Sequence, residues 1–274
     1  MSSSRMTIRL PDDLKQRLND HPEINWSEVA RQSMQQYLTR IELAEELAYL
    51  DKRIGELKTA LEDAGEWEDT IFVVTGDHGE NIGDHGLMDH QYCLYDTLLH
   101  VPLVIHGGPF RNGGETDRLV QLTDLAPTLL DAANIDAPEA RKGFQGVSFH
   151  PESDTEPREY AIAEYMAPQP SMDALEKRVG ELPDHIYKYD RSLRAIRSEE
   201  YKLIRGSDGS RELYHVAEDP EELHDLVDDE PEIVNDLESE LDDWLDSFDP
   251  ATPQESVSMS QSTKNRLEDL GYLQ

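Results

Sequence analysis

Two unbroken apolar runs restrict the fold of this chain more than any other feature of its sequence. The first, TIFVV, covers residues 70–74 and passes directly into TGDHG, and the second, HVPLVIHGG, covers residues 100–108. Apolar runs without alternation are typical of strands that are covered on both faces. A helical pattern precedes the first run, and the amphipathic segment 119–135 follows the second. Strands that alternate with helices predict an α/β domain with a parallel sheet.

The helical pattern before the first strand has leucines and isoleucine at alternating spacings of four and three. Such a repeat could seed a coiled coil, but so short a repeat is more often a helix that lies on a sheet. Gly65 is expected to end this helix. The apolar positions are Leu43, Leu47, Leu50, Ile54, Leu57 and Leu61.

The C-terminal part of the chain has a different pattern. REYAIAEY, SLRAIRSEEYKLIRG and RELYHV are typical of antiparallel strands, with a tight turn at SEE. An acidic helix is expected next, with Ile233, Leu237, Leu241 and Leu245 spaced by four residues. Residues 251–274 are expected to form a flexible linker and a short terminal helix.

The first forty residues differ from the rest in charge. They hold six basic and five acidic residues, net +1, so the other 234 residues hold 19 of the 25 basic and 54 of the 59 acidic residues, net −35. Such a break indicates a domain boundary. The acidic excess favours adaptation to high salt, where charge repulsion is screened. With one cysteine, no apolar leader and no membrane-length run, we expect a cytoplasmic protein with no membrane partner.

Residues 4–10, SRMTIRL, alternate between apolar and polar side chains, as in a half-buried strand. Two helical patterns follow, and the second is capped by Asn25 or Ser27. A strand and two short helices bury too little surface alone, so pairing with a second chain is expected.

This order resembles the ribbon-helix-helix (CopG/Arc-like) family of DNA-binding proteins. The resemblance implies a homodimer through residues 5–40 that binds duplex DNA. Arg5, Thr7 and Arg9 would then contact base edges, and the helix N-terminus at Asn25 and Ser27 would hold a phosphate. The alternative is an amphipathic edge strand with solvated arginines.

The sequence VVTGDHGENIGDHGLMDH, residues 73–90, concentrates metal-binding side chain types directly behind the first buried strand. Ligands of open α/β sheets bind beyond the carboxyl ends of strands. Asp77 and His78 supply an oxygen and a nitrogen there, but two side chains do not complete a metal site. In the alternative reading, Asp77 caps the next turn and His78 is solvated.

Several separate motifs of the chain, in the same order, resemble the sulfatase family of the alkaline phosphatase superfamily. They include AYLDKRIGELKTALEDAG, TIFVVTGDHGENIGDHGLMDH, YDTLLHVPLVIHGG, LRAIRSEEYKLIRG and ELYHVAEDPEELHDL, and they span about residues 45–250. The resemblance implies that Asp77 and His78 bind a divalent cation, usually Ca²⁺. It places His90 near the position of a residue that contacts the sulfate group of a sulfate ester. Asp84 and His85 are expected to lie outside the ligand set.

The resemblance also implies a nucleophile that this sequence lacks. Sulfatases form formylglycine in a C-x-P-S-R motif, but Cys93 lies in QYCLYD, behind the metal motif, so this chain supplies no formylglycine. The expected fold is a truncated alkaline-phosphatase-like α/β sandwich plus a C-terminal α+β antiparallel subdomain, preceded by a small β-α-α ribbon-helix-helix unit. The expected domains are residues 1–44 (ribbon-helix-helix), 45–155 (sulfatase α/β core), 156–250 (sulfatase C-terminal subdomain) and 251–274 (linker and helix).

Four functional hypotheses remain open on the sequence. The chain is a sulfatase-family protein that is inactive alone and has a DNA-binding N-terminus. Alternatively, it is a dimeric regulator that carries a sulfatase-derived domain, or a metal-dependent sulfatase that another chain completes. The fourth is a gene-rearrangement product without a joint function.

Overall fold

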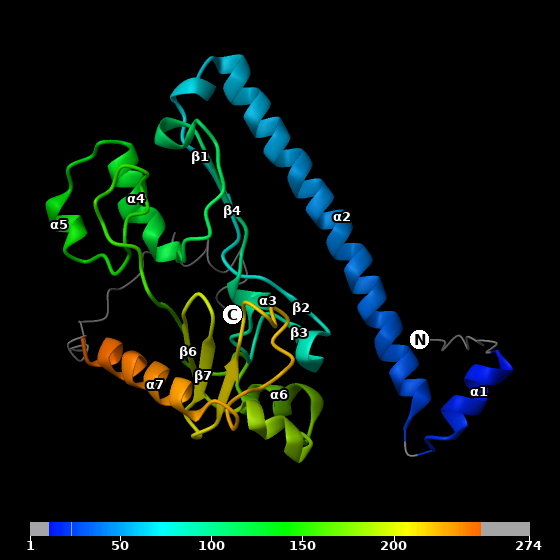
Figure 1. Cartoon of the computed structure of the whole chain (residues 1–274). Coiled ribbons are helices and arrows are strands. Elements are labelled where there is room, and N and C mark those ends of the chain that lie inside the picture. Colours follow the sequence, from blue (N-terminus) through cyan, green and yellow to red (C-terminus); the bar gives the residue numbers. More distant parts are fainter. Residues whose placement is uncertain (1–10, 23, 248–274) are drawn as a thin grey trace.

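The computed structural model describes residues 11–22 and 24–247 (Figure 1). Its first part contains α1 (Asp12–Asn19), the long helix α2 (Trp26–Ala64), β1 (Phe72–Thr75), β2 (Asn81–Ile82), β3 (Met88–Asp89), α3 (Asp96–Leu99) and β4 (Leu103–His106). The second part contains α4 (Leu125–Ala132), α5 (Pro138–Arg141), β5 (Ala161–Tyr165), α6 (Met172–Val179), β6 (Leu193–Arg197), β7 (Lys202–Gly206), β8 (Arg211–Tyr214) and α7 (Pro231–Asp246). Short 3-10 segments occur at Trp67–Asp69, Asp84–Gly86, Gly108–Phe110, Leu122–Asp124 and Asp184–Tyr189.

The two apolar runs form strands, but the expected parallel arrangement is wrong. β1 pairs with β4 in antiparallel orientation, and Phe72 lies opposite His106. A parallel pair needs a crossover connection, usually a long helix. Here the connection contains only the β2–β3 hairpin and the four-residue α3, so the chain turns back beside the strand that it has left.

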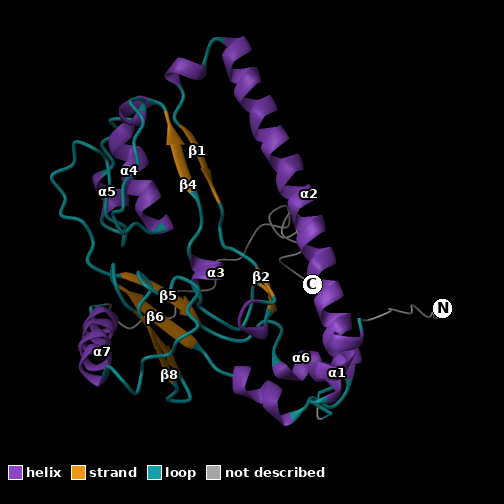
Figure 2. Ribbon diagram, turned by 45° about the vertical axis from the view of Figure 1, so that its right-hand side comes forward, coloured by secondary structure: helices purple, strands orange, loops and turns teal. Residues whose placement is uncertain are grey.

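The C-terminal strands form the antiparallel sheet that the sequence predicts, in the order β5-β6-β7-β8. The expected turn between β6 and β7 is present, and the Ser198 amide donates to the carbonyl oxygen of Tyr201 at 2.8 Å. Helix α7 covers one face of this sheet (Figure 2). Leu237 and Leu241 of α7 are buried against the sheet, as the four-residue spacing predicts, whereas Ile233 and Leu245 are only partly buried against it. Val234, which the spacing did not include, is also buried there.

The opposite face of this sheet packs against the segment that precedes α3. Leu94 is buried among Leu193, Ala195, Ile204 and Tyr214. Because side chains alternate across a strand, β6 and β7 supply apolar residues to both faces and form the centre of the core. The first and second parts of the chain are thereby joined through a continuous apolar contact.

A buried ionic cluster lies within the same contact. Lys202 on β7 is fully buried, and its Nζ lies 2.8 Å from Asp96 Oδ1 and also contacts Glu222. The Asp96 amide donates to Glu222 Oε2 at 2.6 Å, and Arg197 Nε lies 3.4 Å from Asp96 Oδ2. Burial raises the pKa of Glu222, while the Lys202 ammonium opposes this shift. The cluster joins α3, β7 and the loop before α7.

A second buried pair holds α4 near the edge strand β5. The Asp124 carboxylate accepts from the amides of Gln121 and Val147 at 2.8 and 2.7 Å, and it binds the Arg158 guanidinium. The Gln121 side chain in turn donates to the Ile162 carbonyl oxygen of β5 at 2.7 Å. The buried Asp124 carboxylate therefore has two amide donors and one guanidinium as partners, as a buried charged group requires.

Helix α2 continues without a break from Trp26 to Ala64 and runs along the outside of the molecule in both views (Figures 1 and 2). Asn25 caps its start by accepting the Glu28 amide at 3.2 Å, and Gly65 ends it with a left-handed φ of 73°, as expected. The expected domain boundary between residues 44 and 45 lies within this helix. No residue of α2 is buried.

The predicted ribbon strand and the predicted terminal segment lie outside the described residues. Within residues 11–22 and 24–247, no helix combines the length and the apolar character that a bilayer crossing requires.

We expect Lys202→Met to lower the free energy of unfolding by about 3–5 kcal/mol, because it leaves Asp96 and Glu222 buried without their shared cation. Urea unfolding followed by circular dichroism measures this change. Arg194→Met is the matched control, because it removes a pair with Glu164 that is one-third exposed, and it should cost less than about 1 kcal/mol. Equal losses in the two variants would contradict a central role for the cluster.

Candidate metal centre

The turn after β1 places Asp77, His78 and Gly79 beyond the end of this strand, whose residues are half-buried or exposed and not covered on both faces as expected. Gly79 is required here, because a Cβ at this position would lie 2.0 Å from the Thr97 carbonyl oxygen. Its amide donates to the Leu98 carbonyl oxygen at 2.8 Å. The close approach of α3 therefore fixes the backbone next to His78.

The β2–β3 hairpin brings His90 back towards this turn. Asn81 pairs with Asp89 and Ile82 pairs with Met88, so Glu80 and His90 flank the open end of the hairpin on opposite strands. Side chains that lie opposite each other on antiparallel strands are neighbours. The hairpin is held by Asn81, which is fully buried, donates to the Asp89 carbonyl oxygen at 3.0 Å and accepts from the Thr97 hydroxyl at 2.6 Å.

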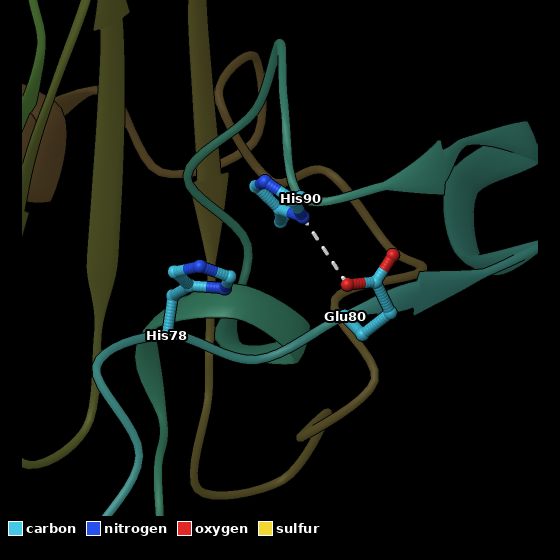
Figure 3. Close-up of side chains that lie close together, drawn as sticks. All are labelled: His78, Glu80 and His90. Carbon is cyan, nitrogen blue, oxygen red and sulfur yellow. Dashed lines mark hydrogen bonds and ion pairs between the residues drawn. The ribbon is translucent and has the colours of Figure 1, made fainter. Parts of the chain in front are cut away.

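His78, Glu80 and His90 form a cluster whose ligating atoms all lie within 4.8 Å of one another (Figure 3). The two imidazole rings stack with centroids 4.3 Å apart. His90 Nδ1 lies 3.2 Å from Glu80 Oε2 and 2.7 Å from Asp89 Oδ1. The side chains of the cluster are 37–46% exposed, so ions in solution can reach them.

Asp77 does not belong to this cluster. Its side chain is 79% exposed, and its Oδ2 lies 3.9 Å from His78 Nε2. Its Oδ1 accepts the amide of His78 at 3.2 Å, as a residue that caps a turn does. The resemblance named His78 as a metal ligand and His90 as a sulfate contact, and it did not name Glu80, which the β2–β3 hairpin brings beside them.

The donor set does not fit the Ca²⁺ that the resemblance implies. Calcium takes six to eight oxygen ligands. The described cluster offers two imidazoles and one carboxylate, and Asp77 and Asp89 beside it are the nearby carboxylates.

Asp84 and His85 lie outside the cluster. Asp84 Oδ2 accepts the Ile82 amide at 2.8 Å, and the His85 ring stacks on Tyr95 with centroids 3.6 Å apart. His85 and Tyr95 line a cavity of about 220 Å³ that also includes Cys93, Arg191 and Glu212. Cys93 is 4% exposed, and burial raises the pKa of its thiol.

The comparisons with known proteins agree with this local structure. Residues 14–135 match the family model described as Sulfatase. The chain is related to the sulfatase family. The match begins within residues 1–44, which were expected to form a ribbon-helix-helix unit, and the comparisons show no such unit. Sulfatases are generally metal-dependent, and the His78 cluster lies within the matched region.

Curated relatives cover most of this sulfatase-like chain. It is 30% identical over 203 residues to N-acetylglucosamine-6-O-sulfatase of Bacteroides thetaiotaomicron, covering 70% of this chain and 32% of that protein. It is 27% identical over 223 residues to arylsulfatase K of Bos taurus, covering 80% of this chain and 38% of that protein. The chain therefore spans about a third of the length of the curated relatives it matches.

Solved structures share the fold. A phosphonate monoester hydrolase of Agrobacterium radiobacter matches with a TM-score of 0.58 and 26% identity, over 72% of this chain and 39% of that one. A 2-O GAG sulfatase matches with a TM-score of 0.60 and 23% identity, over 72% of this chain and 41% of that one. These neighbours confirm the alkaline-phosphatase-like α/β fold of the sulfatase-like region.

The half-buried His85 gives this region a testable pH dependence. Burial lowers the pKa of His85 below its ordinary value of 6.5, although Glu212 and Asp84 oppose the shift. The unfolded chain then binds the proton more readily, so this contribution to stability is present above pH 6.5 and is lost as the pH falls through the lowered pKa. His85→Phe keeps an aromatic ring on Tyr95 and should flatten the decline in the free energy of unfolding between pH 7 and pH 5. The exposed His185→Gln is the control, and an unchanged slope in His85→Phe would contradict the assignment.

Proposed function

We propose that this chain carries part of the sulfate-ester site of a sulfatase but does not hydrolyse the ester on its own. The cluster of His78, Glu80 and His90 at the end of β1 carries the proposal, because it lies within the region that matches the sulfatases. It is exposed to solvent and offers both a cation site and, at His90, a group that can meet sulfate oxygens. A bound divalent cation would supply a Lewis acid that polarises these oxygens.

We expect no turnover because the chain lacks the nucleophile of the sulfatases. The 274 residues include no C-x-P-S-R sequence, and the single cysteine, Cys93, is buried. Because burial raises the pKa of its thiol, Cys93 is protonated at neutral pH and a poor nucleophile. Binding groups without an attacking group give little reaction.

We expect no product from 4-nitrophenyl sulfate when the purified chain is assayed with Ca²⁺, Mg²⁺, Mn²⁺ or Zn²⁺. A phenyl phosphonate monoester belongs in the same assay, since one structural neighbour is a phosphonate monoester hydrolase. Product release that disappears in Asp77→Ala or His78→Ala, and persists in His185→Ala, would overturn the proposal.

Binding without turnover is the positive outcome. Calorimetric titration with 4-nitrophenyl sulfate should show an affinity that falls about 10-fold in His90→Ala, which corresponds to one charge-assisted hydrogen bond. The exposed His185→Ala should leave the affinity unchanged. Equal affinities in all three proteins would place the ester elsewhere.

A second candidate function is a dimeric regulator that binds duplex DNA through its N-terminus. The observation that favours it is apolar exposure on the first two helices. Val29 and Met34 are 40% and 38% exposed, and Tyr37 and Leu38 are 66% and 53% exposed. Contiguous exposed apolar surface marks an interaction site, and a second copy paired through residues 5–40 would cover it. Asn25 and Ser27 stand at the start of α2, where a DNA phosphate would be held.

Light scattering in 2 M NaCl should give the mass of a dimer, and the double substitution Tyr37→Lys and Leu38→Lys should give a monomer. Fluorescence anisotropy with duplex DNA should show that Arg5→Ala with Arg9→Ala weakens binding, whereas Arg211→Ala does not. A monomeric wild-type protein would eliminate this second function and leave the first intact.

The remaining candidate is an active sulfatase completed by another chain. Its support is the two-stranded β1–β4 sheet, in which the outer edges have no further strand among the described residues. Two-stranded sheets are marginal without further cover. Restoration of 4-nitrophenyl sulfate turnover by a second chain with a C-x-P-S-R motif would distinguish this candidate from the first.

A further inference from the structure

We propose that His78, Glu80 and His90 bind a borderline transition metal ion such as Zn²⁺, in place of the Ca²⁺ that the resemblance implies. The inference rests on the chemistry of the cluster and not on the proposed function, because metal binding can be measured without any ester.

In each of the two imidazole rings, Nδ1 is hydrogen-bonded to an oxygen atom, and Nε2 can bind a metal ion. His78 Nδ1 lies 2.8 Å from the Gly79 carbonyl oxygen, which can only accept, so Nδ1 carries the hydrogen. His90 Nδ1 is hydrogen-bonded to Glu80 Oε2 at 3.2 Å and lies 2.7 Å from the Asp89 carboxylate, and both carboxylates can only accept. Each ring therefore keeps the lone pair on Nε2. To reach an ion held at Nε2, the Glu80 side chain must turn away from Nδ1, which Asp89 still holds. Histidines that bind metals are oriented in this way by a carbonyl or a carboxylate on the opposite nitrogen.

The spacing of the donors is close to that of a coordination sphere. Zinc lies about 2.0–2.2 Å from nitrogen and carboxylate ligands, which places neighbouring ligands of a tetrahedral site about 3.3 Å apart. The ligating atoms of the cluster lie within 4.8 Å of one another. The side chains of His78, Glu80 and His90 are 37–46% exposed, so they can rotate and shorten the distances between their ligating atoms to those of a zinc site. Their backbone does not need to move.

The backbone supports come from buried groups on either side. Gly79 is bound to Leu98 of α3, and Asn81 is bound to Asp89 and Thr97. These contacts fix β2 and β3, the strands directly adjacent in sequence to Glu80 and His90, before any ion binds. A site whose backbone is already ordered loses little conformational entropy on binding.

The donor types select the ion. Two imidazoles and one carboxylate are the protein ligands of zinc sites that keep a fourth position open. Imidazole suits zinc, copper and nickel, whereas carboxylate and carbonyl oxygens suit calcium and magnesium. At this cluster two of the three donors are imidazole nitrogens and only Glu80 supplies a carboxylate, whereas calcium is bound by oxygen ligands. In the zinc-bound state His90 is a metal ligand and not a direct donor to sulfate.

Titration of the full chain with ZnCl₂ and CaCl₂ tests the inference. Calorimetry in 1 M NaCl suppresses weak binding of divalent ions to the acidic surface, which carries a net charge of −34. We expect one high-affinity Zn²⁺ per chain, bound at least about 100-fold more tightly than Ca²⁺. Co²⁺ substituted for Zn²⁺ should give visible absorption bands of a four-coordinate site.

His78→Ala and His90→Ala should each lower the Zn²⁺ affinity more than about 10-fold and abolish the Co²⁺ bands. Glu80→Gln keeps the size of the side chain and removes its charge, so it should also weaken binding without affecting the fold. His185→Ala is the matched control and should bind as the wild type does. Circular dichroism verifies that each variant is folded.

Two results would overturn the inference. One is Zn²⁺ binding that is unchanged in His78→Ala and His90→Ala, and the other is tighter binding of Ca²⁺ than of Zn²⁺. Failure of the ester assays would not bear on it, because the readouts here are metal affinity and the spectrum of Co²⁺.

Discussion

The buried contact between Lys202, Asp96 and Glu222 is the interaction on which the rest of the structure depends. Lys202 lies on the central strand β7, Asp96 begins α3, and Glu222 lies in the loop before α7. A fully buried ammonium is tolerated only with opposite charge around it, so these three segments must meet in one arrangement. Leu94 packs against β6 and β7 in the same contact, and the side chains of Lys202 and Glu222 are 0% and 1% exposed. The first and second parts of the chain are therefore held in register by charge as well as by burial.

The same contact reaches the candidate metal centre through α3. Asp96 fixes the start of this helix, and the following Thr97 and Leu98 hold Asn81 and Gly79. Because α3 has only four residues, it has little stability of its own and depends on these anchors. The position of His78, Glu80 and His90 is thus set by a chain of polar contacts that begins on the C-terminal sheet. A substitution of Lys202 should therefore displace His78, Glu80 and His90, although Lys202 does not contact these residues.

The spacing of apolar residues predicted the strands and helices that have one apolar face with a regular repeat. The strands β5 to β8, the turn after β6 and the apolar face of α7 follow from alternation and from spacing by four. The orientation of β1 against β4 did not follow, because two apolar runs look alike in parallel and antiparallel pairs. Lys202 reads as an exposed strand residue, and only the structure shows its burial. Within the site, His78 and His90 were recognised from the motif. Glu80 was missed because its proximity to His90 depends on the pairing of a short hairpin, which local sequence does not specify.

Helix α2 leaves much of its apolar surface uncovered. Leu47, Leu50 and Leu57 of α2 are each more than 50% exposed, although their spacing is that of a helix packed on another surface. In contrast, the heavily acidic helix α7 buries its apolar face completely enough for Leu241 to be 0% exposed. Net charge therefore does not explain the exposure of α2. What distinguishes the two helices is the presence of a sheet: α7 lies on four paired strands, whereas α2 leads into a sheet of two.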